Sequence, residues 1–291
     1  MSEDRGQKSE DRNSKTVIPL LRSLKPVFFV LFSVFCLLFS AFCFAENIKE
    51  PNVAGAFYPE NRQELTSLIE KYLREAKDVK TIGEPVVLIS PHAGYIYSGP
   101  VAAYGFKALS AKKFTTVLIL APAHYFPFSG ASVYREGFFR TPLGDLKIDS
   151  GLASDLIKHN PKLLFFEPGY FEREHSVEVE LPFLQTVLQP GFKIVPILLG
   201  DMTYEECEAL ASSLADAIKN KSVLVVASTD LSHYRPYDEA ISYDTKTIVF
   251  IKDFDSRGLW DAVSGTSWNV CGFRPVVTSM LYAKLQGANK I

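Results

Sequence analysis

Short, continuously apolar runs alternate along this chain with longer segments of helical periodicity. The runs that predict strands are Val86–Ser90, Thr115–Leu120, Lys193–Leu199 and Ser222–Ala227. Continuously apolar strands separated by helices are typical of a sheet that is largely parallel and covered on both faces. The pattern therefore predicts a three-layer α/β fold. Pro196 interrupts the third run, which predicts an edge strand or a bulge there because proline donates no hydrogen bond.

The segments between these runs have the periodicity of amphipathic helices. Asn61–Lys77 places its apolar side chains on one stripe, and Asn61 begins a capping-box pattern. A second capping box, at Thr203, begins the helix that we expect over Thr203–Lys219. Further helices are expected over Ser98–Leu109, Asp149–His159, Ser176–Leu188, Asp238–Lys252 and Gly272–Leu285.

The N-terminal part of the chain has a different character. A polar stretch with basic residues precedes Val27–Ala45, an uncharged apolar run of roughly 19 residues, close to the length that spans a bilayer. This order is typical of an export signal, although Cys43 stands where a smaller residue is usual. An uncleaved membrane anchor and a buried helix are the alternatives. We expect residues 1–45 to be a signal or anchor, and residues 46–291 to form one domain that is periplasmic or otherwise extracytoplasmic.

Composition limits the classes of partner. The chain has 291 residues and a net charge of −2, which gives no electrostatic reason to expect nucleic acid as a partner. Cys36 and Cys43 lie in the apolar run, so Cys207 and Cys271 alone form no disulfide framework in the domain. No HExxH, P-loop or GxSxG motif supports the familiar hydrolase and nucleotide-binding functions. The oligomeric state is not constrained by the sequence.

Three of the five histidines follow predicted strands by only a few residues. His92 follows the first strand and His124 the second, while Asp230 and His233 follow the last. The carboxyl ends of parallel strands lie along one edge of the sheet, so these side chains should converge in a crevice there. Converging imidazoles bind transition metals or transfer protons near neutral pH, whereas a single one is equally a solvated loop residue. Asp230 either orients His233 or caps its loop.

Two other residues are candidates for the same crevice. Cys271 stands at the start of the helix expected over Gly272–Leu285, where backbone N–H groups lower a thiol pKa. It is therefore a candidate thiolate ligand, and a small buried apolar residue is the alternative. His175 precedes the helix expected over Ser176–Leu188, so it is either a pocket residue or part of a cap in which Ser176 is the N-cap.

Seven motifs make the chain from about residue 50 to 285 resemble the Memo family, whose microbial members are also called AmmeMemoRadiSam system protein B. The motifs are "VAGAFYP", "SPHAGYIYSG", "APAHYFP", "RTPLGDLKID", "EHSVEVELPFLQ", "STDLSHY" and "VCGFRP", in that order. The family's fold resembles that of class III extradiol ring-cleaving dioxygenases, which use non-haem iron. The resemblance therefore implies the same three-layer α/β architecture, with helices on both faces of the sheet.

The resemblance also implies a site and a chemistry. The family's metal ligands correspond here to His92, His124 and Cys271. The implied metal is Fe²⁺, with copper second and zinc third, since two imidazoles and one thiolate suit all of these ions. His233 then lies beside the metal as acid or base, with Asp230 and His175 in support. These features imply a redox enzyme with a small-molecule substrate, although ring-cleaving dioxygenases have a carboxylate at the position of Cys271.

Two further functions stay open. Animal members of the family are linked to cell-motility signalling through phosphotyrosine-bearing receptors, which implies a binding protein with a peptide in the crevice. A zinc hydrolase that uses a metal-bound water is the third hypothesis for the function. Tyr95, Tyr97 and Arg274 either line the crevice or only pack near it. The chain stops at Ile291, whereas the family continues with a segment that returns to the sheet, so we expect either a truncated C-terminus or an open sheet edge near the site.

Overall fold

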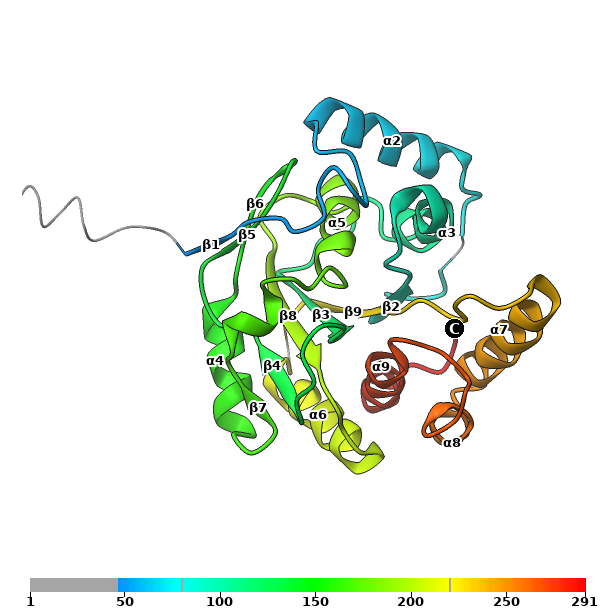
Figure 1. Ribbon diagram of the computed structural model, residues 1–291. Coiled ribbons are helices and arrows are strands. Elements are labelled where there is room, and N and C mark those ends of the chain that lie inside the picture. Colours follow the sequence, from blue (N-terminus) through cyan, green and yellow to red (C-terminus); the bar gives the residue numbers. More distant parts are fainter. Residues whose placement is uncertain (1–46, 80, 220) are drawn as a thin grey trace, which may run out of the picture. The chain divides into compact units, whose positions relative to one another are not determined.

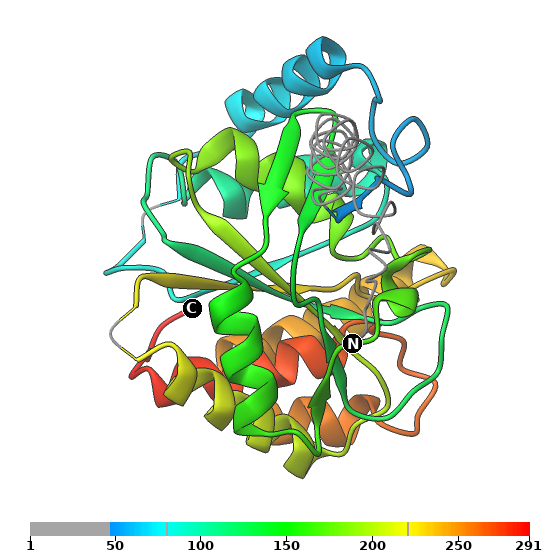
Figure 2. The same cartoon turned by 90° about the vertical axis from the view of Figure 1, so that its left-hand side faces the viewer.

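A computed structural model describes residues 47–79, 81–219 and 221–291. Asn47–Ile291 form one compact unit in which a central sheet lies between two layers of helices (Figures 1 and 2). This confirms the α/β fold that the sequence predicts. The signal or anchor expected at residues 1–45 lies outside the described residues. Among the residues that are described, no helix is both long and apolar enough to cross a membrane.

The central sheet has six strands in the order β2-β9-β3-β8-β4-β7. Their bounds are β2 Val87–Ser90, β9 Val223–Ser228, β3 Thr116–Pro122, β8 Lys193–Leu199, β4 Ala131–Val133 and β7 Leu164–Phe165. The first four are parallel, and β4 pairs antiparallel with β8. Every residue of β3 and β9 is buried, as expected for strands with both faces covered.

Side chains of β3 alternate between two apolar cores, one on each face of the sheet. Val117 and Ile119 join the core under α2 (Arg62–Glu75), α3 (Tyr95–Lys107) and α5 (Leu181–Val187). Leu118 and Leu120 join the core on the opposite face. The helices of that face are α4 Ser150–His159, α6 Tyr204–Ala217, α7 Tyr237–Lys252, α8 Ser256–Val263 and α9 Phe273–Leu285 (Figure 2). This alternation follows from the two-residue period of a strand.

Helix starts agree with the capping signals in the sequence. Asn61 accepts hydrogen bonds from the backbone N–H groups of Gln63 and Glu64 at the start of α2. Thr203 and Glu206 form a complete capping box at α6. Helix α8 was not predicted, because it is short and contains a glycine. Cys207 is fully buried in α6, and burial raises the pKa of its thiol to about 11, so it is a core residue.

A small sheet, not anticipated from the sequence, lies beside the main one. It has the order β1-β5-β6, with β1 Ile48–Lys49, β5 Phe138–Thr141 and β6 Gly144–Lys147. Strands of two to four residues show too little periodicity to be recognised. Phe139 and Leu146 attach this sheet to the core under α2 and α5.

The expectation for Pro196 was wrong, because β8 is an interior strand that pairs in continuous register with β3. The carbonyl of Pro196 accepts a hydrogen bond from the backbone N–H of Tyr134, just beyond the last residue of β4. In an antiparallel pair, the N–H and C=O of one residue face the same neighbour. The nitrogen of Pro196 therefore faces the chain just beyond the end of β4, where its lack of a hydrogen removes no ladder hydrogen bond.

The single helix expected over Ser176–Leu188 was also wrong. The segment forms a short 3-10 helix, η2 (Glu178–Glu180), followed by α5. Ser176 is no N-cap, since its hydroxyl donates to the carbonyl of Pro122 at the end of β3. This contact attaches the segment to the carboxyl edge of the sheet.

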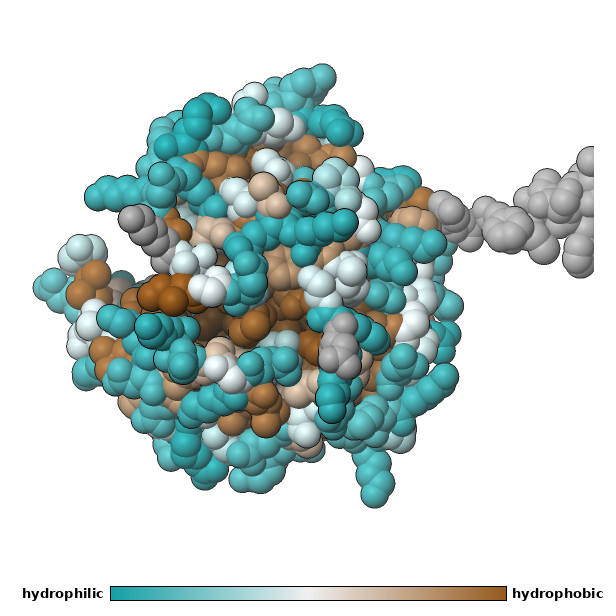
Figure 3. Space-filling model, turned by 180° about the vertical axis from the view of Figure 1, so that it is seen from behind, coloured by the Kyte–Doolittle hydropathy of each residue, from teal (hydrophilic) through white to brown (hydrophobic). Residues whose placement is uncertain are grey.

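Strand β2 is an edge strand in the described part of the chain, since its pairing there is with β9 only. A groove of about 900 Å³ lies beside it, lined by residues of β2, α3, α9 and the last residues of the chain. From behind, apolar surface gathers in a hollow across the middle of the molecule (Figure 3). The histidines of the candidate site are not among the residues that line this groove.

Candidate metal centre

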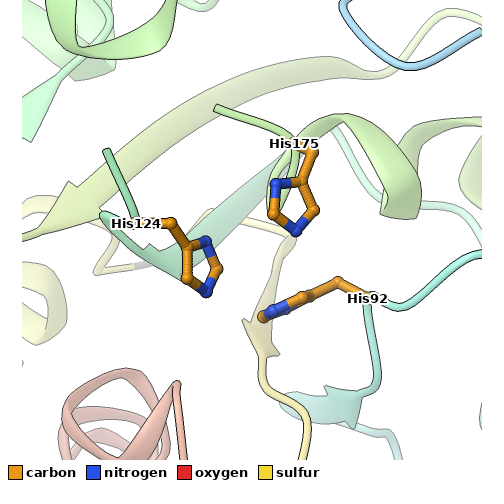
Figure 4. A group of neighbouring side chains, drawn as sticks. All are labelled: His92, His124 and His175. Carbon is orange, nitrogen blue, oxygen red and sulfur yellow. The ribbon is translucent and has the colours of Figure 1, made fainter. Parts of the chain in front are cut away.

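Three histidines converge at the carboxyl edge of the main sheet. His92 follows β2 and His124 follows β3, while His175 comes from the segment before η2. Figure 4 shows the three imidazole rings turned toward one another, and one nitrogen from each ring lies within 4.8 Å of the others. Strands β2, β9 and β3 are neighbours in the sheet, which is why loops far apart in sequence meet here.

His92 is buried, with an exposed fraction of 1%, and both of its ring nitrogens are in contact with polar groups. Nδ1 lies 2.7 Å from the Ser228 hydroxyl, and Nε2 lies 3.3 Å from Cys271 Sγ. Burial lowers the pKa of His92 well below 6.5, and the neighbouring imidazoles lower it further. The ring is therefore neutral at pH 7, which is the form that binds metals.

His124 is oriented by Glu174, a buried carboxylate that the sequence analysis did not single out. Glu174 accepts from Nδ1 of His124 at 2.9 Å and from its backbone N–H at 2.6 Å. The same carboxylate accepts from the backbone N–H groups of His175 at 2.8 Å and Ser176 at 2.9 Å. A carboxylate on one ring nitrogen fixes the ring and increases the basicity of the other nitrogen.

The charges of His124 and Glu174 stabilise each other. Burial alone would lower the pKa of His124, but hydrogen bonds to Cys271 and Glu174 raise it to about 10. Burial would likewise raise the pKa of Glu174, but its contacts with His124 lower it to about 2. In the metal-free protein His124 is thus an imidazolium ion between a carboxylate and a cysteine. A metal ion and a proton would compete for its Nε2.

Cys271 lies beside the histidine cluster, next to His92. Its Sγ accepts a hydrogen bond from the backbone N–H of Asp230 at 3.2 Å and is half-buried. Sulfur and nitrogen ligands of one tetrahedral ion lie roughly 3.5 Å apart, close to the 3.3 Å that separates Cys271 Sγ from His92 Nε2. Gly272 makes this approach feasible, because a Cβ there would lie 2.3 Å from the carbonyl oxygen of Ser228.

His175 is the third histidine of the cluster, whereas His233 is not among the described residues whose possible ligand atoms lie within 4.8 Å of one another. His175 stacks on His124 with ring centroids 4.8 Å apart, and burial lowers its pKa. Nδ1 of His233 is buried and has no hydrogen-bond partner within the described ranges. Asp230 contacts His92 instead of orienting His233, since it accepts from the His92 backbone N–H at 2.9 Å.

The structure gives Tyr95, Tyr97 and Arg274 different surroundings. Tyr95 is buried in the core, and its hydroxyl donates to the carbonyl of Val179. Tyr97 is exposed on α3. Arg274 donates to the carbonyl of Met202 and pairs with Asp201, which attaches α9 to the start of α6.

The fold and the site define an α/β protein with a candidate metal centre at the carboxyl edge of its sheet. The family model described as Memo-like protein matches residues 49–291. A MEMO1 family protein of Caldivirga maquilingensis is 36% identical over 256 residues, which cover 84% of this chain and 89% of that protein. MEMO1 family proteins of Saccharolobus solfataricus and Sulfurisphaera tokodaii are each 36% identical over 250 residues, covering 81% of this chain and 88% of theirs. The chain belongs to the Memo family.

Proposed function

We propose that this protein binds one transition metal ion through His92, His124 and Cys271, and that it is a redox enzyme acting on a small molecule. The main support is the meeting of two imidazole nitrogens and a sulfur whose neighbours already orient them. Two nitrogen ligands and one sulfur ligand suit Fe²⁺ or copper, and we propose iron first. Such an ion would supply one-electron chemistry and dioxygen activation.

The other polar side chains have separate roles in this proposal. His175 is neutral at pH 7 because its pKa is lowered, so it can accept a proton from a substrate. His233 has a free buried ring nitrogen within the described residues and is the second acid/base group. Asp230 positions the loop of His92 by accepting a hydrogen bond from the His92 backbone N–H.

Metal binding should become tighter as the pH rises. The pKa of His124 is about 10, so a metal ion that binds Nε2 near neutral pH must displace a proton. We expect the apparent association constant to rise at least about tenfold per pH unit from about pH 6 to 9, because binding displaces the proton of His124 and requires Cys271 as a thiolate. Titration calorimetry in buffers of different ionisation enthalpy measures the released protons. An affinity independent of pH would contradict this assignment of His124.

The redox proposal is tested by oxygen consumption. Protein loaded anaerobically with iron should consume dioxygen with a catecholic or thiol substrate. His175→Ala and His233→Ala should reduce turnover at least tenfold while the metal content stays unchanged, since a positioned acid or base contributes about 10²–10⁴ in rate. Stoichiometric iron or copper without oxygen consumption would favour the binding protein. Zinc with ester or amide turnover would favour the hydrolase.

A further inference from the structure

A buried set of polar groups lies behind His92, on the side away from Cys271. The Ser228 hydroxyl lies 2.7 Å from His92 Nδ1, 2.9 Å from Glu180 Oε1 and 2.7 Å from the carbonyl oxygen of Ser176. Ser228 and Glu180 are both almost fully buried. One hydroxyl thus has three polar neighbours at hydrogen-bond distance. It can donate to only one of them, and it can accept from two, because it has one proton and two lone pairs.

Counting protons assigns the direction of each contact. The Ser176 carbonyl can only accept, so the Ser228 proton points to it. The contact with Glu180 then needs a proton on Glu180, and the contact with His92 needs a proton on Nδ1. An ionised Glu180 would compete with the Ser176 carbonyl for a single proton and leave a buried acceptor without a partner. Burial favours the same assignment, because it raises the pKa of Glu180 to about 8.

We propose that Ser228 and a neutral Glu180 are positioning residues, which hold His92 in the tautomer with its proton on Nδ1 and its Nε2 lone pair facing Cys271. The pair matters to metal binding only if the proposed function is correct, but the tautomer is a property of the metal-free protein. Imidazole binds a metal through its unprotonated nitrogen, and the group on the other nitrogen decides which nitrogen that is. Glu180 donates to Ser228 and so occupies one lone pair of the hydroxyl, which leaves the other for Nδ1–H.

Two variants separate this role from a purely structural one. Glu180→Gln keeps a neutral side chain that donates to Ser228, so His92 should keep its tautomer and metal affinity should stay within about twofold. Ser228→Ala removes the acceptor of Nδ1–H, so the tautomers should mix. Loss of such a supporting contact typically weakens metal affinity about 10- to 100-fold. If Glu180 instead acted through a negative charge, Glu180→Gln would weaken metal affinity more than Ser228→Ala.

The test is the ¹⁵N NMR spectrum of histidine-labelled, metal-free full-length protein, with His92 assigned by its loss in His92→Gln. We expect the Nδ1–H pattern in the wild type and in Glu180→Gln, and a mixed pattern in Ser228→Ala. An unchanged pattern in Ser228→Ala, or an Nε2–H pattern in Glu180→Gln, would overturn the proposal.

Infrared spectroscopy of the wild type at pH 6 is a second test that does not depend on Ser228→Ala folding. It should show the C=O band of a protonated buried carboxyl, and this band should be absent in Glu180→Gln. The absence of such a band from the wild type would overturn the proposal. Neither measurement involves metal, so a failure of the metal-site proposal would leave both results unchanged.

Discussion

Glu174→Leu is expected to lower the free energy of unfolding of the metal-free protein by about 3–5 kcal/mol, as is typical when one partner of a buried ion pair is removed. The reason is that Glu174 is buried and accepts four hydrogen bonds, from the ring and backbone of His124 and from the backbones of His175 and Ser176. Leucine fills a similar volume but accepts none of them. Urea unfolding measures the loss.

The control is Glu172→Leu, two residues earlier on the exposed surface, which should change stability by about 0.5 kcal/mol or less. The pKa of Glu174 is about 2 in the folded protein, below its usual value of 4.5, so its stabilising contribution is present above pH 4.5. This contribution should disappear as the pH falls from about 4.5 to 2 in the wild type, and be missing throughout in Glu174→Leu. A loss below about 1 kcal/mol in Glu174→Leu would contradict the role given to this carboxylate.

Glu178→Leu is expected to release the N-terminal segment that leads into α2, and to cost about 3 kcal/mol or more because a buried acceptor of several hydrogen bonds is lost. Glu178 is buried and accepts from the Tyr58 hydroxyl at 2.6 Å and from the backbone N–H groups of Asn52 and Val53 at 2.6 and 3.0 Å. The same segment places Phe57 against His175, with ring centroids 4.9 Å apart. Loosening it should therefore also affect the site.

Limited proteolysis and urea unfolding measure this effect. Glu178→Leu should be cleaved between about residues 50 and 60 much faster than the wild type, since proteolysis follows the population of locally opened states. Tyr58→Phe is the matched control, because it removes only one of the three hydrogen bonds and should cost about 1–2 kcal/mol. Equal stability of Glu178→Leu and the wild type would show that the segment is fixed by apolar packing alone.

The four parallel strands of the main sheet, and the convergence of His92 and His124, were predictable from the sequence, but His175 joins them where His233 was expected. Strands β3, β8 and β9 consist almost wholly of buried apolar residues, so their period and composition leave little ambiguity. His92 follows β2 and His124 follows β3, and their convergence at one edge of the sheet then follows from parallel topology. Cys271 was a candidate from its place at the start of the last predicted helix, and the family resemblance implied its role as a ligand. The structure places it directly before Gly272, the N-cap of α9, and 3.3 Å from His92 Nε2.

The supporting carboxylates could not be predicted in the same way. Glu174 stands among polar residues, and Glu178 and Glu180 alternate with valines, all just before a helix, where exposed acids are common. Their burial depends on a tertiary contact, the passage of this segment over the carboxyl ends of β3 and β9. The one available signal for burial was the alternation of acids with valines in "EHSVEVE", since an exposed acidic stretch needs no apolar residues between its acids. The sequence left two places open for Tyr95, because an aromatic residue near a loop has the same pattern whether it lines a crevice or fills the core.

The most direct test of the metal site is the metal content of the purified protein by elemental analysis. The wild type should contain about one iron or copper ion per chain, and His92→Ala and Cys271→Ala should contain almost none. His159→Ala, which changes an exposed histidine on α4, should keep the metal. An absence of metal from the wild type even after anaerobic iron loading, or an unchanged content in both site variants, would contradict a metal centre at these residues.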